Sequence, residues 1–181
     1  MNLDISESLS SLKSGGIIIY PTDTVYGLGA DIHSETAVEK IHTLKERSSK
    51  EKPISILLKK EWIPDYTDLS ELAEKRVEEL LPGPYTLVLK KTDKVPVWIA
   101  NQDYVGIRVI DTIVVNELLD KFSSPITTTS ANLRGAPPPK SIEEIPDAII
   151  NSVDSIIDTG PIISKGPSTV IKINEKEEVL R

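Results

Sequence analysis

Apolar and polar positions follow patterns along the chain that predict strands interleaved with helices. Short apolar or β-branched runs indicate strands, and apolar residues that recur every three or four positions indicate helices. The expected strands cover residues 17–20, 54–58, 85–89, 104–109, 125–130, 155–158, 169–173 and 179–180. The expected helices cover residues 5–12, 34–45, 69–81, 114–122 and 142–150. Elements interleaved in this way predict an α/β fold in which helices flank a twisted mixed sheet.

The stretch GGIIIYPTDTVYGLGAD, residues 15–31, is the segment around which a site is expected to form. Its apolar run is continuous rather than alternating, which is typical of a strand covered on both faces. In an extended segment the hydroxyls of Thr22 and Thr24 would share one face, and the aspartate between them would point away. Gly27 and Gly29 would let the backbone approach whatever the hydroxyls bind. A tight turn formed by threonine and aspartate would explain the same residues.

Length, charge and composition limit the class of protein. A chain of 181 residues without an internal repeat or a linker fits a single domain, residues 1–181. The net charge of −7 argues against a wide surface that binds nucleic-acid phosphates, so any anion site would be local. There is no cysteine, no signal peptide and no apolar run of about 18 residues, so we expect a cytoplasmic protein without disulfides or membrane contact.

Several common catalytic motifs are missing from the sequence. It has neither the P-loop pattern nor the third glycine of a dinucleotide-binding fingerprint, and it has no GxSxG sequence around a serine. The only histidines, His33 and His42, lack the spacing of metal ligands or of a catalytic triad. Both are expected to be solvated surface groups, and no protein metal site is expected.

Lys45 and Arg47 begin the most basic stretch of the chain, residues 45–52, at the end of an expected helix. The helix dipole would stabilise each cation there by about 0.3–1 kcal/mol, and this alone would explain them. Side chains two positions apart diverge on a helix, so both can face one ligand only if the helix ends between them. The polar residues that follow favour such an end.

A row of polar side chains ends the expected strand of sequence PITTTS. In an extended chain Thr128, Ser130 and Asn132 point the same way, at the strand end where open sheets bind ligands. An exposed strand would carry the same residues. Arg108, inside an apolar strand, and Arg181 add guanidinium groups suited to phosphate and carboxylate. Hydroxyls, amides and fixed cations without a base or a nucleophile suggest nucleotidyl transfer by positioning and charge neutralisation.

Seven segments, in this order and spacing, resemble the YrdC-like threonylcarbamoyl-AMP synthases. They are YPTDTVYGLGAD, LKER followed by KP, LPGPYTLVLKK, VGIRV, PITTTSANLRGAPP, IIDTG and GPSTVI, and the resemblance covers residues 15–181. It implies a single-domain YrdC-like fold with a large concave, positive cavity. It also implies that L-threonine, bicarbonate and ATP give L-threonylcarbamoyladenylate and pyrophosphate, for threonylcarbamoyl-adenosine modification of tRNA.

The resemblance assigns roles to particular residues. It implies that catalysis depends on Lys45, Arg47, Ser130 and Asn132. It implies that ATP is bound by Lys45, Arg47, Tyr104, Thr128, Ser130, Pro138 and Arg181, and threonine by Thr24, Arg108 and Ser168. Tyr104 replaces a smaller polar residue of the family, and Pro138 stands where some relatives offer a serine, which leaves only backbone there. Mg²⁺ is expected to accompany ATP and to help pyrophosphate leave.

The resemblance also implies partners and leaves alternatives open. The product would pass to tRNA threonylcarbamoyl-transfer proteins, and a contact with tRNA itself is a further expectation. Long relatives carry a second domain, so closure over the product is expected from loops of this chain. The alternatives are a non-catalytic RNA-binding module and a paralogue that acts on another carboxylate or carbamoyl substrate. The acidic net charge argues against the module, and the basic residues 45–52 argue for it.

Overall fold

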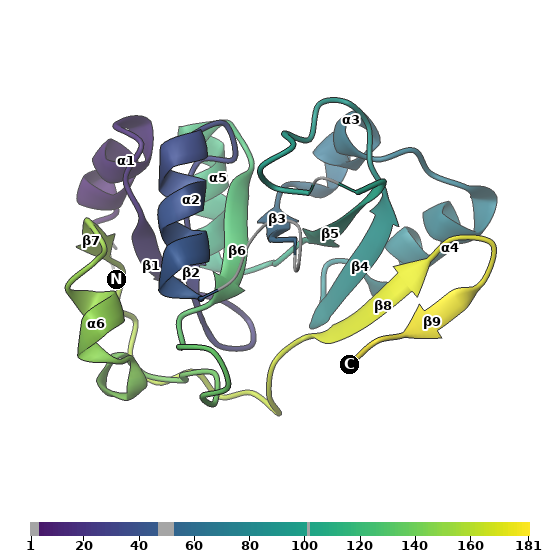
Figure 1. Ribbon diagram of the computed structural model, residues 1–181. Coiled ribbons are helices and arrows are strands. Elements are labelled where there is room, and N and C mark those ends of the chain that lie inside the picture. The colour runs from purple at the N-terminus through teal and green to yellow at the C-terminus, as the bar shows by residue number, and fades with distance from the viewer. Residues whose placement is uncertain (1–3, 47–52, 101) are drawn as a thin grey trace.

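The computed structural model describes residues 4–46, 53–100 and 102–181, and these form a twisted mixed sheet flanked by helices (Figure 1). Within this part of the chain the sheet has nine strands in the order β7-β1-β2-β6-β3-β5-β4-β8-β9. Parallel and antiparallel pairs occur in the same sheet, so the predicted fold class is confirmed. The strands are β1 (Ile18–Pro21), β2 (Tyr26–Gly29), β3 (Ser55–Leu57), β4 (Tyr85–Lys90), β5 (Tyr104–Arg108), β6 (Ile126–Ser130), β7 (Ser155–Ile156), β8 (Thr169–Ile173) and β9 (Glu177–Val179).

Three of the helices in the described part of the chain begin at side-chain caps. The α-helices are α1 (Ser6–Lys13), α2 (Glu35–Leu44), α3 (Ile63–Tyr66), α4 (Glu71–Leu80), α5 (Ile113–Phe122) and α6 (Asp147–Ile150), and the 3₁₀ helices are η1 (Lys60–Trp62) and η2 (Ile142–Glu144). The side chains of Ser34, Ser70 and Thr112 each accept a hydrogen bond from the amide three residues later. Such caps satisfy amides that have no partner inside the helix. No helix in the described ranges is long and apolar enough to cross a bilayer.

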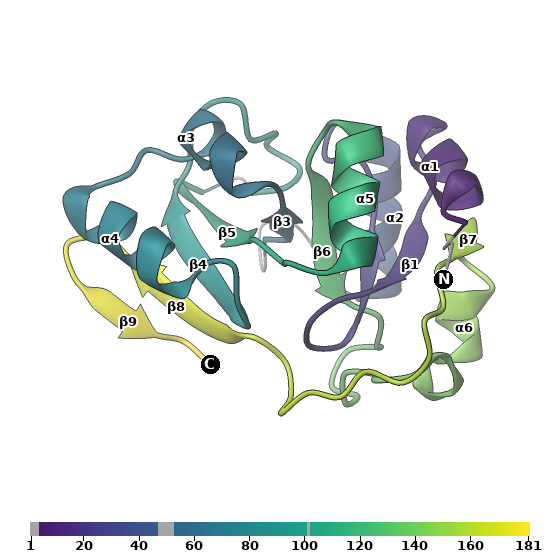
Figure 2. The same ribbon diagram turned by 180° about the vertical axis from the view of Figure 1, so that it is seen from behind.

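The two faces of the sheet are covered differently. Side chains alternate between the faces of a strand, so neighbouring residues belong to different layers. One face is apolar across most strands, includes Ile19, Ile56 and Ile107, and packs against α2, α3, α4 and α6. The opposite face has a smaller core, around Ile18 and Ile126, which packs against α1 and α5. Figure 2 shows α5 in front of β6 and β1 on this second side.

The second face is open over β5, β4 and β8. In both views α3 and α4 lie on one side of these strands, and no helix of the described residues lies on the other side (Figures 1 and 2). Ile107, Leu87 and Ile171 pair across these three strands and belong to the covered core. Because side chains alternate, the residues next to them project from the open face. This half of the sheet is therefore able to present polar side chains to a ligand.

Gly106 lies in the middle of the open face, where the neighbouring strands leave no room for a side chain. A Cβ atom at this position would lie 2.3 Å from Oγ of Ser55 on β3 and 3.2 Å from Cγ2 of Thr86 on β4. Both contacts come from strands in the same sheet as β5, and the spacing of paired strands is fixed by their hydrogen bonds. A glycine is therefore required for Ser55 and Thr86 to keep their positions on either side of β5.

The strand β2 was not predicted from the sequence. It pairs with β1 in an antiparallel hairpin, so Gly27 and Gly29 lie inside the sheet and are buried. A Cβ atom at Gly29 would lie only 2.8 Å from Cε1 of Tyr20. The glycine makes room for this buried ring, and packing rather than approach of a ligand explains its presence.

Three other expectations need correction. The helix expected at residues 142–150 is divided into η2 and α6, because Pro146 lies between them as the residue that precedes α6. The segment at residues 60–66, for which no element was expected, forms η1 and α3. His42 is buried rather than solvated, and its Nε2 atom lies 3.3 Å from the carbonyl oxygen of Trp98.

Candidate functional site

The open face of the sheet carries polar side chains in place of a second core. Thr86 on β4 and Arg108 on β5 project from this face, because their neighbours Leu87 and Ile107 belong to the covered core. Thr128 projects from β6 on the same side. All three polar residues are buried, with less than a tenth of their surface exposed. Buried polar groups require hydrogen-bond partners or a ligand, so this face is the first candidate for a site.

Arg108 places a buried positive charge on this face. The residue is 6% exposed, and one terminal nitrogen donates a hydrogen bond of 2.5 Å to Oδ1 of Asp23. Its Nε atom is buried and has no hydrogen-bond partner among the described residues. A guanidinium group has five N–H donors, and a buried donor without a partner costs about 1–3 kcal/mol. The arrangement therefore leaves part of the guanidinium group for an anion such as a carboxylate.

The turn between β1 and β2 fixes the position of Asp23. Oγ1 of Thr22 accepts hydrogen bonds from the amides of Thr24 and Val25, both at 3.1 Å, and donates one of 2.7 Å to the carbonyl oxygen of Val25. The two threonine hydroxyls lie 3.1 Å apart, on the same side as their spacing predicted, although in a turn rather than an extended segment. Since Oγ1 of Thr22 accepts hydrogen bonds from two amides and donates its single hydrogen to Val25, it does not donate to Thr24. The lone pairs of the Thr24 hydroxyl are then available as acceptors.

Tyr20 lies next to this turn as a neutral, buried phenol. Its hydroxyl lies 3.4 Å from the carbonyl oxygen of Thr127. Burial raises the pKa of Tyr20 to about 12, while a hydrogen bond with Thr128 and the charge of Arg108 act in the opposite direction. The ring is therefore uncharged at neutral pH and adds no negative charge beside the arginine.

Ser168 and Arg181 meet Thr86 at the β8 side of the open face. The side-chain oxygens of Thr86 and Ser168 lie 2.8 Å apart. The guanidinium group of Arg181 donates hydrogen bonds of 3.2 and 3.3 Å to the carbonyl oxygen of Ser168. Burial and, to a smaller extent, the positive charge of Arg108 lower the pKa of Arg181. Two guanidinium groups near enough to affect each other favour an anion in their neighbourhood.

A second cluster forms at the end of β6 around Lys45, Ser130 and Asn132. Nζ of Lys45, a residue that is 7% exposed, donates hydrogen bonds to the carbonyl oxygen of Ser130 at 2.8 Å and to Oδ1 of Asn132 at 2.6 Å. Oγ of Ser130 donates to the same Oδ1 atom at 2.6 Å, and Nδ2 of Asn132 donates to the carbonyl oxygen of Ala136. A buried ammonium group needs such oxygen atoms around it. The cluster therefore fixes one positive charge and the start of the following loop.

The expected helix end near Lys45 is observed. α2 ends at Leu44, Lys45 is its C-cap, and Glu46 has a left-handed backbone with a φ of 48°. The chain thus leaves the helical path directly before Arg47. Arg47 itself lies outside the described residues, and its position and role stay predictions.

Tyr104 and Pro138 occupy different surroundings. Tyr104 begins β5 on the open face, and Nζ of Lys172 lies 4.3 Å from the centre of its ring. Pro138 is half-buried in the loop that follows the Lys45 cluster. The structure therefore places Tyr104 on the same face as Arg108, and Pro138 beyond the end of β6.

The predicted residues fall into groups that adjacent strands connect. Thr128 pairs with Ser55 of β3, whose side chain reaches the position of Gly106, two residues before Arg108. The groups are Lys45 with Ser130 and Asn132, Arg108 with Asp23, the residue before Thr24, and Ser168 with Arg181. Each group has one member on or directly before β6, β5 or β8, and these strands belong to the run β6-β3-β5-β4-β8 of the sheet. The assignment of each residue to ATP or to threonine stays a prediction.

Three residues of this face were not identified from the sequence. Asp23 was expected to point away from the threonine hydroxyls but contacts Arg108, and Thr86 and Lys172 were not considered. Thr86 alternates with the core residues of β4, and Lys172 with those of β8. The alternation was therefore a usable signal for both. The contact of Asp23 joins segments far apart in sequence and has no local signal.

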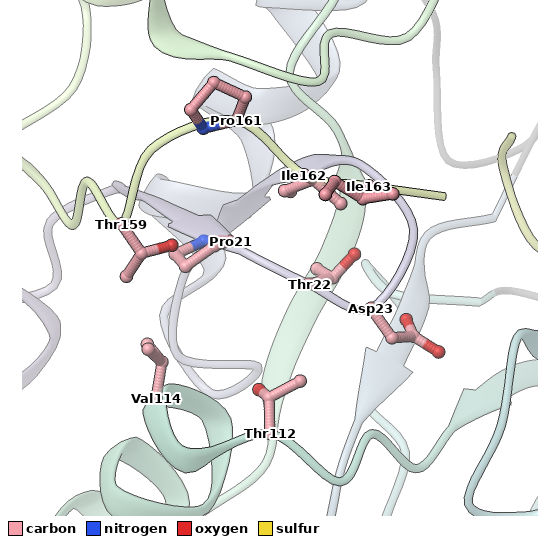
Figure 3. Close-up of a pocket in the computed structure, with 9 residues that line it drawn as sticks. All are labelled: Pro21, Thr22, Asp23, Thr112, Val114, Thr159, Pro161, Ile162 and Ile163. Carbon is pink, nitrogen blue, oxygen red and sulfur yellow. The ribbon is translucent and has the colours of Figure 1, made fainter. Parts of the chain in front are cut away.

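A hollow of roughly 250 Å³ lies beside the β1–β2 turn (Figure 3). It is lined by Pro21, Thr22, Asp23, Thr112, Val114, Thr159, Pro161, Ile162 and Ile163. Among these described residues there is no cation, so the hollow is unsuited to a carboxylate or phosphate on its own. A second hollow of roughly 330 Å³, near Lys59 and Asp120, contains none of the predicted site residues. The large concave cavity implied by the resemblance therefore stays a prediction.

The segment from Asp158 to Ser168 crosses the β1–β2 turn and is attached to it. The hydroxyl of Tyr26 lies 2.9 Å from Oδ1 of Asp158 and 2.8 Å from the carbonyl oxygen of Gly160. Oγ of Ser164 donates a hydrogen bond of 2.5 Å to the carbonyl oxygen of Thr24. These contacts hold the segment beside the residues predicted to bind threonine.

Comparison with known proteins identifies the family of this chain. The profile of the Sua5/YciO/YrdC family, described as "Telomere recombination", matches residues 10–181. A relative from Methanocaldococcus jannaschii is 40% identical over 165 residues, which are 91% of this chain and 77% of that protein. The threonylcarbamoyl-AMP synthase of Vibrio campbellii is 31% identical over 182 residues, 98% of each chain.

A solved structure extends the comparison to three dimensions. P. abyssi Sua5, crystallised with L-threonine, is 32% identical and superposes with a TM-score of 0.88. The match covers 96% of this chain but 52% of the P. abyssi protein, so this chain spans about half the length of that relative. The family expected from the sequence motifs is confirmed. By profile, by sequence identity and by fold, this chain belongs to the Sua5/YciO/YrdC family.

Proposed function

We propose that this protein synthesises L-threonylcarbamoyladenylate from L-threonine, bicarbonate and ATP and releases pyrophosphate. A threonylcarbamoyl-AMP synthase aligns with 98% of the chain, and a related protein has been crystallised with L-threonine. The observation that carries the proposal is the guanidinium group of Arg108, which is buried yet keeps one donor without a partner among the described residues. That group suits the carboxylate of an amino acid.

Threonine would bind between the β1–β2 turn and the β8 side of the open face. Arg108 would hold its carboxylate, and the hydroxyls of Thr24 and Ser168 would form hydrogen bonds to the rest of the molecule. Thr24 is 2% exposed and Ser168 is 6% exposed, so contacts with them would be shielded from water. Hydrogen bonds in such a place contribute more to specificity, because a ligand that cannot form them leaves buried groups unpaired.

ATP would bind toward the end of β6. Lys45 would neutralise phosphate charge, together with Arg47 and Arg181, while Ser130, Asn132 and Thr128 would donate or accept hydrogen bonds. Tyr104 would contact the nucleotide through its ring, and Pro138 through backbone only. The support for Lys45 is its fixed ammonium group, which hydrogen bonds to Ser130 and Asn132 hold in place before any ligand arrives. A cation fixed in advance stabilises developing charge without reorganisation.

The chemistry joins two anions. The amine of threonine attacks bicarbonate to give the carbamate and water, and a carbamate oxygen then attacks the α-phosphorus of ATP. The bond between the α-phosphorus and the bridging oxygen breaks, and pyrophosphate leaves with the electron pair. Two unit charges 4 Å apart repel by about 4 kcal/mol at an effective dielectric constant of 20. Fixed cations that offset this repulsion and hold both reactants account for the proposed catalysis.

Mg²⁺ would enter this site with ATP. No group of three or more His, Cys, Asp or Glu within the described ranges could hold a metal ion by itself. Mg²⁺ commonly uses one or two carboxylates together with substrate phosphates and waters. The residues present therefore fit a metal ion that is held mainly by the triphosphate, where it would neutralise charge on the leaving pyrophosphate.

The product would be consumed by proteins that transfer the threonylcarbamoyl group to an adenosine of tRNA. Direct contact with tRNA would involve the basic residues 45–52, most of which lie outside the described ranges. The alternative of a non-catalytic RNA-binding module is less favoured, because the relatives are named as synthases and the net charge is −7. A paralogue with another carboxylate substrate would keep the same anion-binding groups.

Release of pyrophosphate from ATP tests the proposal. The purified protein is incubated with MgATP, bicarbonate and threonine, and pyrophosphate and the adenylate are measured by coupled assay and mass spectrometry. We expect both products only when threonine and bicarbonate are present together. Omission of each substrate and replacement of threonine by serine, valine or glutamate are the controls. Pyrophosphate release that does not depend on threonine, or RNA binding without any release, would contradict the proposed function.

A further inference from the structure

Asp23 stands beside Arg108 because its turn is held by neighbouring residues. Hydrogen bonds to Oγ1 of Thr22 fix the backbone on both sides of the turn, and Oδ1 of Asp23 accepts a bond of 2.5 Å from Arg108. In Figure 3 the carboxylate of Asp23 points away from Pro21 and Thr159. Its side chain is 21% exposed, whereas that of Arg108 is 7% exposed. The carboxylate is therefore the more accessible member of the pair.

The ion pair does not use up either partner. A carboxylate has about four acceptor positions and a guanidinium group has five donors, and the contact between Asp23 and Arg108 uses one of each. Nε of Arg108 is buried and without a partner among the described residues. A pair that served stability alone would leave this buried donor unexplained. The unused donors of Arg108 and the unused acceptor positions of Asp23 indicate a ligand that carries both a negative and a positive group.

We propose that Asp23 binds the α-ammonium group of the amino-acid substrate while Arg108 binds its carboxylate. The inference rests on the proposed function and adds to it a residue that selects the amine. In an amino acid the nitrogen lies two bonds from the carboxylate carbon, a distance of about 2.5 Å. A group that binds the ammonium must therefore stand directly beside the one that binds the carboxylate. Asp23 has that position.

Thr24 supports the same assignment. The Thr22 hydroxyl donates its hydrogen to Val25 and not to Thr24, so the lone pairs of the Thr24 hydroxyl can accept a hydrogen bond from an ammonium group. Asp23 and Thr24 are consecutive residues of one turn and would offer two acceptors to the same nitrogen. An acceptor pair of this kind suits the three donors of an ammonium group.

The pair of charges also predicts rejection of one class of ligand. A hydroxy acid brings a carboxylate to Arg108 but no positive charge to Asp23, so the two carboxylates repel each other. The site would therefore bind zwitterions in preference to hydroxy acids of the same shape. A purely structural ion pair would not distinguish the two ligands.

Calorimetric binding to the whole protein tests this inference. The ligands are L-threonine and the stereochemically matched 2,3-dihydroxybutanoate, in which a hydroxyl replaces the amine. The variants are Asp23→Asn and the control Asp65→Asn, which breaks an exposed ion pair with Lys94 that is also 2.5 Å long. Asp23→Asn is expected to weaken threonine binding by about 10- to 100-fold. Its binding of dihydroxybutanoate is expected to stay the same or to become tighter, because a repulsive charge has gone.

The outcomes separate this inference from the proposed function. If Asp23→Asn weakens both ligands equally, or neither, the role of Asp23 is overturned even though threonine is bound. If Asp23→Asn does not fold, the wild-type protein alone decides: equal affinity for the two ligands overturns the inference, and preference for threonine by about tenfold or more supports it. A wild-type protein that releases no pyrophosphate but binds threonine with this preference would contradict the proposed function and retain the amine site.

Discussion

Replacing Gly106 by alanine is expected to destabilise the sheet, because β3 and β4 leave no room for a side chain at this position. The new Cβ atom would lie 2.3 Å from Oγ and 3.1 Å from Cβ of Ser55, and 3.2 Å from Cγ2 of Thr86. These atoms lie on different strands, so moving away from one neighbour brings the methyl group toward the other. The substitution therefore adds volume to a place that cannot widen without weakening the hydrogen bonds between strands.

The size of the expected loss of stability depends on which of these atoms can move. Oγ of Ser55 can rotate about χ1, so the shortest contact can be relieved by a change of rotamer. The contacts with Cβ of Ser55 and with Cγ2 of Thr86 stay, and they require shifts of a few tenths of an ångström. Overpacking of this kind typically costs about 1–3 kcal/mol. We expect the free energy of unfolding of Gly106→Ala to fall within that range.

Urea unfolding, followed by far-ultraviolet circular dichroism, measures this loss in a double-mutant cycle with Ser55→Ala. Removing Oγ of Ser55 takes away the shortest contact, so the double variant should recover about 0.5–1.5 kcal/mol relative to the sum of the single changes. The control is Gly27→Ala in β2, where a Cβ atom would have no contact shorter than 3.4 Å. It should change stability by less than about 1 kcal/mol.

The reasoning would be refuted by either of two results. One is a Gly106→Ala protein as stable as the wild type, which would mean that the strands yield without cost. The other is strict additivity of Gly106→Ala and Ser55→Ala, which would mean that the two side chains do not compete for the same space.

Three further substitutions test the site and its surroundings. Ser130→Ala removes a hydrogen bond that orients Asn132, so the rate of pyrophosphate release should fall by about 100-fold while the free energy of unfolding falls by less than about 1.5 kcal/mol. The control is Ser152→Ala, which removes an exposed serine hydroxyl outside the candidate site. Near-normal turnover of Ser130→Ala would exclude the Ser130 hydroxyl from a role in catalysis. Burial raises the pKa of Tyr20 to about 12, so above pH 10 the unfolded chain loses a proton that the folded protein keeps. The free energy of unfolding of the wild type, measured relative to that of Tyr20→Phe, should therefore not depend on pH below about pH 10 and should fall by roughly 2–3 kcal/mol between pH 10 and 12. If urea unfolding gave the two proteins parallel pH profiles, the raised pKa of Tyr20 would be contradicted. Tyr26→Phe removes the contacts with Asp158 and Gly160, so amide hydrogen exchange at residues 158–164 should become about 5- to 100-fold faster with little change in β4, and unchanged exchange would show that other contacts hold the segment.

Most of the sheet could be predicted from the sequence because its strands are short apolar runs. β2 could not, since its sequence YGLG contains two glycines and only two larger residues. It forms a strand because it pairs with β1 and because Gly29 leaves space for the ring of Tyr20. Both depend on tertiary contacts rather than on local sequence. The continuous helix expected at residues 142–150 is not formed because Pro146 interrupts it, and the prediction from apolar spacing did not take this proline into account.

Several residues that the structure brings together could be identified from the sequence, but not all of their partners. The motifs identified Lys45, Ser130 and Asn132, and the structure joins these three by hydrogen bonds. The partner of Arg108 was not predicted, because Asp23 lies 85 positions away in sequence and the local pattern of its turn gives no direction for its side chain. A charge inside an apolar strand shows that a partner or ligand must exist, but not which residue it is.

The order of the strands has a consequence for how the protein is made. β4 receives its second neighbour, β8, only when the chain has reached Thr169, and β1 receives β7 only at Ser155. On the ribosome, the edge of β4 that faces away from β5 would therefore stay unpaired until β8 has been synthesised. Such an edge can capture a strand of another nascent chain. The proposed binding surface is thus among the last parts to form, and we expect interrupted translation to leave a polypeptide that associates with others rather than a smaller folded protein.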